Sequence, residues 1–143
     1  FFSSINLNVD KSFITQEQAD LVDPKIIMRL FETPIGRKMQ KAECLLREFK
    51  FSVLVDAEQY IEGAVAEEIL LQGVVDCAII EPDGITVIDF KTDRVRNCDV
   101  DLLVRRYRPQ VEAYAMAISR IYEKPVKKTL LYLFDADMAV DMQ

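Results

Sequence analysis

The fold of this chain is decided by residues 73–93, Gly-Val-Val-Asp-Cys-Ala-Ile-Ile-Glu-Pro-Asp-Gly-Ile-Thr-Val-Ile-Asp-Phe-Lys-Thr-Asp. Two apolar, β-branched runs, 73–80 and 85–90, flank Glu-Pro-Asp-Gly. This pattern predicts a β-hairpin. Because both runs are nearly continuous hydrophobic segments, the hairpin is expected to be buried on both faces.

Two turn lengths are consistent with this hairpin. A two-residue turn at Asp83-Gly84 would set Asp76 opposite Lys91, whereas a four-residue turn over 81–84 would set Asp76 opposite Asp89. Side chains alternate along a strand with a period of two. Both registers therefore place Asp76, Asp89 and Lys91 on one face of the sheet.

That face carries an unusual amount of charge for a buried strand pair. Charged side chains are rarely buried unless they are paired or bind a metal. Neighbouring carboxylates repel each other, and Mg²⁺ commonly uses one or two carboxylates together with phosphate oxygens and water. A lysine pointing the same way can orient or deprotonate a water, and metal, water and ammonium together favour phosphodiester hydrolysis. The alternative is a solvated face on which Asp and Lys form ordinary cross-strand pairs.

Gly73-x-x-Asp76 followed by Asp-Phe-Lys-Thr-Asp at 89–93 resembles the core motif of PD-(D/E)XK nucleases, in the branch that includes RecB. More of the chain is similar to the C-terminal nuclease domain of AddA-type subunits of bacterial ATP-dependent helicase–nucleases. The resemblance covers most of residues 13–134. The stretches that carry it, in order, are 13–20, 33–37, 47–51, 71–76 and 106–114.

The resemblance implies an α/β fold with a restriction-endonuclease-like core, in which helices flank a mixed central β-sheet. It implies a metal-dependent deoxyribonuclease, an exonuclease, that uses Mg²⁺ or Mn²⁺. Asp76, Asp89 and the Phe90 backbone carbonyl are the implied metal ligands. The implied catalytic residues are Asp76, Asp89, Lys91, Gln110 and Tyr114.

Gln110 and Tyr114 enter this set through the resemblance alone. They are four residues apart and share a face of a predicted helix, and they match the family's Gln-x-x-x-Tyr motif beside the active site. In that role they would hold phosphate or the lysine. Without the resemblance, Tyr114 is interpreted as a core residue and Gln110 as a surface residue.

The implied partners are DNA, in the form of single-stranded ends, the helicase domains of the same chain, and an AddB-type partner subunit in a heterodimer. The implied process is DNA end processing in recombinational repair in the cytoplasm. No Walker motif is present, so ATP use is not expected of these residues. Two alternatives stay open: a catalytically degenerate nuclease fold that docks DNA or a partner subunit, and a pure interaction module.

One departure from the family pattern concerns histidine. RecB-like nucleases carry a histidine on a helix upstream of the first strand as a further metal ligand, and this chain has none. We expect that histidine to lie before Phe1. Glu48 has two interpretations, as a residue supporting the metal or a basic group, or as an exposed strand residue.

The formal net charge is −6, which is unfavourable for contact with phosphate. The charge is unevenly spread, however, since residues 91–108 carry +3 and the remainder −9. This segment is interpreted either as a basic patch beside the metal site or as a solvated loop and helix end. The predicted DNA contacts are Lys91, Arg94, Arg105, Arg106 and Arg108.

At 143 residues, half of them apolar, the chain is expected to form a single nuclease domain, a fragment of a longer protein, with ragged ends at 1–12 and 135–143. No signal peptide or membrane-spanning run is present, and no membrane association is expected. The three cysteines lack CxxC spacing and no histidine accompanies them, so a zinc or iron–sulfur site is not indicated and reduced thiols are expected.

Local signals predict the remaining elements. Capping patterns at Thr15, Asp23-Pro24 and Thr33-Pro34 each predict a helix start, and Pro109 fits the first turn of a later helix. The predicted helices run from Thr15 to Leu21, from Pro24 onward, from Pro34 to about Cys44, from 99 or 101 to 106, and from Pro109 to about Tyr122. The predicted strands outside the hairpin are 49–55 and 128–134, and 69–72 extends the hairpin's first strand.

Overall fold

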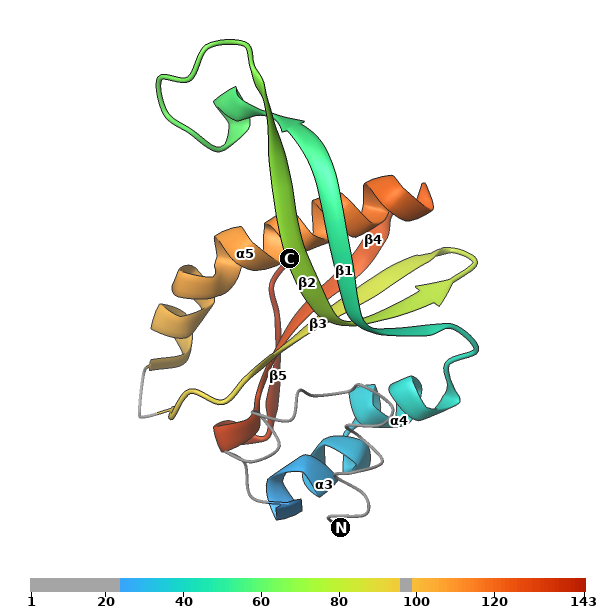
Figure 1. Cartoon of the computed structure of the whole chain (residues 1–143). Helices are drawn as coiled ribbons and strands as arrows, with labels where there is room; N and C mark the ends of the chain where they lie inside the picture. The colour runs from blue at the N-terminus through green and yellow to red at the C-terminus, as the bar shows by residue number, and fades with distance from the viewer. Residues whose placement is uncertain (1–23, 96–98) are drawn as a thin grey trace.

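A computed structural model describes residues 24–95 and 99–143 of the chain. Its centre is a five-stranded sheet with the order β1-β2-β3-β4-β5. Neighbouring strands are antiparallel except β3 and β4, which are parallel. The strands are β1 Leu45–Asp56, β2 Glu68–Glu81, β3 Gly84–Lys91, β4 Val126–Leu133 and β5 Met138–Asp141. With helices on both sides of this sheet (Figure 1), the mixed α/β architecture is confirmed.

The predicted hairpin is formed by β2 and β3. Its pairing runs from Cys77 opposite Ile88 to Glu81 opposite Gly84, and one more step along the same register sets Asp76 opposite Asp89. This is the register expected from a four-residue turn over 81–84. Because Glu81 and Gly84 also pair with each other, the loop itself consists only of residues 82–83. The Asp83-Gly84 turn is therefore wrong. Pro82 supplies the fixed φ that suits the first loop position.

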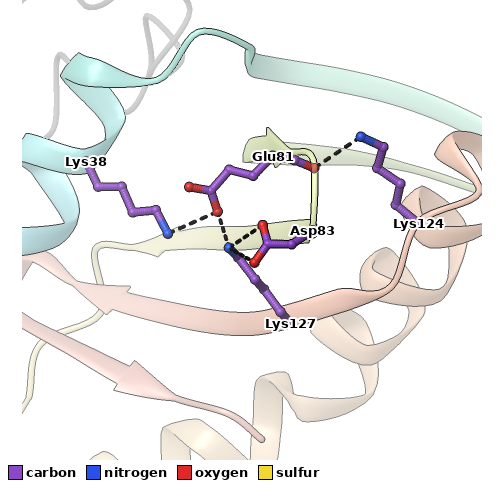
Figure 2. A network of polar contacts seen from close by, with 5 residues as sticks. All are labelled: Lys38, Glu81, Asp83, Lys124 and Lys127. Atoms are coloured by element: carbon purple, nitrogen blue, oxygen red, sulfur yellow. Dashed lines mark hydrogen bonds and ion pairs between the residues drawn. The ribbon is translucent and has the colours of Figure 1, made fainter.

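An ion network surrounds this turn (Figure 2). Lys127 of β4 pairs with Glu81 and, at 3.0 Å, with Asp83. Lys38, from the helix α4 at Pro34–Lys41, lies 3.2 Å from Glu81, and Lys124 donates to the Glu81 backbone carbonyl at 3.1 Å. The turn end of the hairpin is thereby tied to α4 and to the start of β4.

The helices α3, Pro24–Glu32, and α4 cover one face of the sheet. The predicted start of α4 is confirmed, since Thr33 Oγ1 accepts a hydrogen bond from Gly36 N at 3.1 Å. The predicted end near Cys44 is wrong: α4 ends at Lys41, and the Cys44 carbonyl accepts from Ile80 N at 3.0 Å as the chain enters β1. The core on this side consists of Leu30, Ile35, Met39, Cys77, Ile79, Ile88, Phe90, Leu130, Tyr132 and Phe134.

One long helix, α5 at Asp99–Tyr122, covers the opposite face. The predicted break at Pro109 is wrong, because the helix continues through the proline. A proline inside a helix costs about 3 kcal/mol, but Leu103 before it and Val111 after it are both buried against the sheet, within the cluster that includes Leu131 and Leu133. Burying two such side chains contributes about 1.5–3 kcal/mol each, so packing on both sides of the proline outweighs the local penalty.

The end of the chain is ordered rather than ragged. The predicted strand at 128–134 is confirmed as β4, and a 3₁₀ turn, η2 at Phe134–Ala136, leads into β5. Met142 is buried, and its carbonyl accepts from Arg108 Nη1 at 2.6 Å. The expectation of a ragged segment at 135–143 is therefore wrong. The ragged segment predicted at 1–12 and the helix predicted at 15–21 lie outside the described residues.

The strands β1 and β2 form a ribbon that extends beyond the rest of the sheet (Figure 1). β1 pairs with β2 as far as Asp56 opposite Glu68, whereas β3 pairs only with 77–81. A 3₁₀ turn, η1 at Ala57–Gln59, begins the connection at the tip. In the part of the chain that the structure describes, no helix combines the length and apolarity that a bilayer crossing requires.

Candidate functional site

Asp76 of β2 and Asp89 of β3 face each other beneath α5, at the end of the hairpin away from its turn. Asp89 is buried, with 2% of its surface exposed, and Asp76 is half-buried. Asp76 Oδ2 accepts a hydrogen bond from Phe90 N at 2.9 Å. The alternation of side chains along each strand turns both carboxylates toward α5 while Cys77 and Ile88 pack on the α3–α4 side.

Burial makes the ionised state of this carboxyl pair unfavourable. The pKa of Asp76 is raised from 3.8 to about 8, chiefly by desolvation and also by the charge of Asp89 and a hydrogen bond between the two carboxyls. The Phe90 N–H and the Lys91 ammonium act in the opposite direction and lower this pKa. The pair therefore holds a proton near neutral pH unless another cation takes its place.

Lys91 lies at the end of β3 and reaches the same site. Its Nζ is 3.0 Å from Asp89 Oδ2 and donates to Gln110 Oε1 at 3.0 Å. Burial by itself lowers the pKa of Lys91, but the attraction of Asp89, its hydrogen bond and the charge of Asp76 outweigh burial and raise the pKa. The side chain is therefore a charged, partly desolvated ammonium.

The donor set fits a divalent cation that completes its shell elsewhere. Asp89 Oδ2 is buried and lies 3.0 Å from the Lys91 ammonium. Within residues 24–95 and 99–143 no group of three or more His, Cys, Asp or Glu side chains could hold a metal ion. Two facing, largely desolvated carboxylates match the way Mg²⁺ combines one or two protein carboxylates with phosphate and water. The Phe90 carbonyl remains a predicted ligand.

Glu48 is a further carboxylate next to Asp76 in the strand register. It lies on β1 between two residues that pair with Cys77 and Val75, but its backbone adopts a left-handed φ of 47° and it is half-buried. A left-handed φ is uncommon for a residue other than glycine. Neither of its two predicted interpretations is decided by this geometry.

The structure brings Gln110 and Tyr114 to the site from α5. Gln110 contacts Lys91 directly. The ring of Tyr114 packs edge-on against Phe51, with the ring centroids 5.7 Å apart, and a Cβ at Gly73 would lie 2.9 Å from the Tyr114 ring. Desolvation raises the pKa of Tyr114, and the charge of Asp89 raises it further, so its hydroxyl stays protonated beside the carboxylates.

The predicted basic residues do not converge on the carboxylates. Arg94 and Arg105 are exposed, and Arg106 Nη1 lies 4.0 Å from Asp93. Arg108 is held by the Met142 carbonyl and lies 3.7 Å from Glu112. Of the five predicted DNA contacts, Lys91 alone belongs to the carboxylate cluster as the structure describes it, and the role of the others stays a prediction.

Sequence reasoning missed Tyr107 and Asp93. The Lys91 Nζ lies 4.2 Å from the centroid of the Tyr107 ring, and the Tyr107 hydroxyl is 3.0 Å from each oxygen of Asp93. A signal was present in the sequence, because Tyr107, Gln110 and Tyr114 follow each other at spacings of three and four and therefore share one helix face.

Residues 14–141 match the family described as the PD-(D/E)XK nuclease superfamily. The chain is 40% identical over 139 residues to an ATP-dependent helicase/nuclease subunit from Alkaliphilus oremlandii (strain OhILAs), covering 95% of this chain and 12% of the relative. It is 35% identical over 140 residues to the corresponding helicase/nuclease subunit from Clostridium novyi (strain NT), covering 94% and 11%. The chain thus spans about an eighth of the length of the curated relatives it matches.

Proposed function

Because the chain belongs to the PD-(D/E)XK nuclease superfamily, we propose that it hydrolyses phosphodiester bonds of DNA as the metal-dependent nuclease domain of a helicase–nuclease. The observation that carries this proposal is the pairing of Asp76 with Asp89 under α5, with the Lys91 ammonium 3.0 Å from Asp89. Burial and mutual repulsion make two ionised carboxylates unfavourable at this position, and a bound divalent cation would relieve that cost.

In this function Asp76, Asp89 and the Phe90 carbonyl hold Mg²⁺ or Mn²⁺. The ion supplies Lewis acidity and a hydroxide nucleophile when it is bound. The Lys91 ammonium orients the attacking water and stabilises negative charge that develops on the phosphate. Gln110 fixes the ammonium through its side-chain oxygen, and Tyr114 presents a protonated hydroxyl that can donate to a phosphate oxygen.

The substrate that we propose is the single-stranded end of a DNA molecule, delivered by helicase domains of the same protein. Arg94, Arg105 and Arg106 are exposed near the start of α5 and are available to phosphate groups beyond the scissile bond. The proposed partner is a subunit of the AddB type, and DNA end processing in recombinational repair in the cytoplasm is the proposed role. The names of the relatives, which combine helicase and nuclease, support this assignment.

The test of the proposed function replaces Asp89 with asparagine. Asp89→Asn keeps the size of the side chain but removes one ligand charge, so cleavage of labelled single-stranded DNA in Mg²⁺ is expected to fall by about 100-fold or more. Metal binding, followed by calorimetry, is expected to weaken with it. Asp56→Asn, on the exposed end of β1, serves as the matched control and is expected to cleave normally. Normal cleavage by Asp89→Asn, with folding verified, would refute the proposed site.

A second candidate function is a catalytically degenerate module that docks DNA or a partner subunit. The observation in its favour is that, in the described part of the chain, no third side-chain ligand joins the two aspartates in a group that could hold a metal ion. The two candidates differ in whether the protein cleaves the single-stranded DNA that it binds. Metal-dependent cleavage supports the enzyme, whereas DNA binding without cleavage in Mg²⁺ or Mn²⁺ supports the docking module.

A further inference from the structure

Tyr107 lies against the Lys91 ammonium, and the proposed nuclease function gives this tyrosine no role. It lies on α5 one turn before Gln110, and the Lys91 Nζ is 4.2 Å from its ring centroid. A cation at this distance from an aromatic ring is attracted by the ring's quadrupole, and the attraction is larger where water is partly excluded. Lys91 is half-buried, so this condition is met.

The Tyr107 ring is itself held in place. Its hydroxyl lies 3.0 Å from both carboxylate oxygens of Asp93, and Arg106 Nη1 lies 4.0 Å from the same carboxylate. The backbone beside Asp93 is anchored as well, because Val95 N donates to Asp135 Oδ2 at 2.8 Å. The ring therefore has a fixed position relative to the loop that follows β3.

The other contacts of Lys91 show why a contact with the Tyr107 ring matters. Within the described chain its ammonium meets Asp89, Gln110 and the Tyr107 ring. A divalent ion on Asp89 would compete for the carboxylate and repel the ammonium. The contacts from α5 do not depend on Asp89, so they can keep the ammonium in place when the ion pair weakens.

We infer that Tyr107 is a positioning residue for Lys91, with its ring as the contact surface for the ammonium and Asp93 as the anchor of the ring. The catalytic importance of Tyr107 rests on the proposed function, whereas its contact with Lys91 is independent of that function. Tyr107 also packs at the edge of the cluster around Leu103 and Val111. Its test must therefore separate positioning from packing.

The first measurement uses the folded, metal-free protein. Lysine is labelled with ¹³C at Cε, and Lys91→Arg identifies the Lys91 signal by its loss. A methylene close to an aromatic face is shifted upfield by the ring current. We expect this shift to disappear in Tyr107→Leu, and to shrink but persist in both Tyr107→Phe and Asp93→Ala, because each of these two variants keeps the ring and removes its hydrogen bond to the anchor. A Lys91 signal that is the same in Tyr107→Leu and in the unsubstituted protein would overturn the inference.

The matched control is Tyr122→Leu. Tyr122 is a half-buried tyrosine of the same helix that packs against Phe49 with ring centroids 5.9 Å apart, remote from Lys91. It reports the general cost of removing a tyrosine ring from α5. We expect Tyr122→Leu to lower thermal stability and to leave the Lys91 signal unchanged.

The second measurement follows turnover on single-stranded DNA with Mg²⁺. We expect Tyr107→Leu to lower kcat by about 2- to 30-fold, the range that corresponds to a cation–π contact, while KM and the metal affinity stay within about twofold. Tyr107→Phe, which keeps the ring, is expected to retain most of the activity. A loss in Tyr107→Phe as large as in Tyr107→Leu, or one matched by Tyr122→Leu, would overturn the inference. If the unsubstituted protein does not cleave DNA, the proposed function fails, and the lysine spectrum alone decides the positioning role.

Discussion

Replacing Asp76 with asparagine is expected to stabilise the metal-free protein at neutral pH. Burial and the neighbouring Asp89 raise the pKa of Asp76 from 3.8 to about 8. Between these two pH values the unfolded chain has lost a proton that the folded chain retains. The free energy of unfolding therefore falls as the pH rises through this window, and it is restored below pH 4.

The size of the effect follows from the shift. At pH 7 the group is about three pH units above its unfolded pKa, and at 1.36 kcal/mol per unit the upper bound is about 4 kcal/mol. Water penetration and side-chain rearrangement on deprotonation reduce this to about 1–3 kcal/mol. Asparagine keeps an oxygen that can accept from Phe90 N, so the variant retains the local hydrogen bond and loses the electrostatic cost.

Thermal unfolding at pH 4, 6 and 8 measures this prediction. Asp76→Asn is expected to melt about 3–10 °C above the unsubstituted chain at pH 8 and within about 2 °C of it at pH 4. Mg²⁺ should raise the melting temperature of the unsubstituted chain more than that of the variant, because only the former keeps both ligand charges. A difference in melting temperature that does not shrink from pH 8 to pH 4, or a variant less stable at pH 8, would refute the reasoning.

Two further predictions concern Lys91 and Gly73. Lys91→Ala is expected to lower turnover by about 100-fold or more and to change the metal affinity by less than about threefold, because the lysine stabilises charge without binding the ion. If the metal affinity measured by calorimetry falls as much as the rate of cleavage, the lysine instead holds the carboxylates in place. Gly73→Ala places a Cβ 2.8 Å from the Phe51 ring and 2.9 Å from the Tyr114 ring, so it is expected to cost about 1–3 kcal/mol in urea unfolding, and a neutral result would show that the Tyr114 ring moves freely.

The hairpin and its charged face could be predicted because both follow from local rules. A turn-forming Pro-Asp-Gly between β-branched runs predicts the strands, and a period of two places Asp76, Asp89 and Lys91 together whichever even-length turn is chosen. The choice of register could not be made from the sequence. It depends on where the turn closes, and that end of the hairpin is held by Lys38 and Lys127 from elements distant in the chain.

The errors at α5 and at the C-terminus arise because tertiary packing outweighs local signals. Pro109 is a strong local signal for a helix start, but the apolar residues on both sides of it share one buried face. The residues of β5 are too few and too exposed to form a recognisable strand pattern, and they are ordered by pairing with Leu130–Leu133 of β4. Tyr107 was missed because a single tyrosine on an amphipathic helix is ordinarily a packing residue.

The ribbon formed by β1 and β2 ends in a tip that lies far from the β2–β3 turn. A change of chain length at this tip is therefore not expected to alter the register that sets Asp76 opposite Asp89. Asp76 is set opposite Asp89 by the closed turn and by the ion pairs around Glu81, all of which lie at the end of β2 away from the ribbon's tip. The connection after η1, where Gly63 has no neighbouring atom within 4 Å of an added Cβ, is therefore a suitable place for an inserted loop, a fluorophore or an affinity tag. By contrast, a single residue inserted into α5 between Tyr107 and Gln110 would rotate one relative to the other by about 100° and separate two of the groups that hold Lys91.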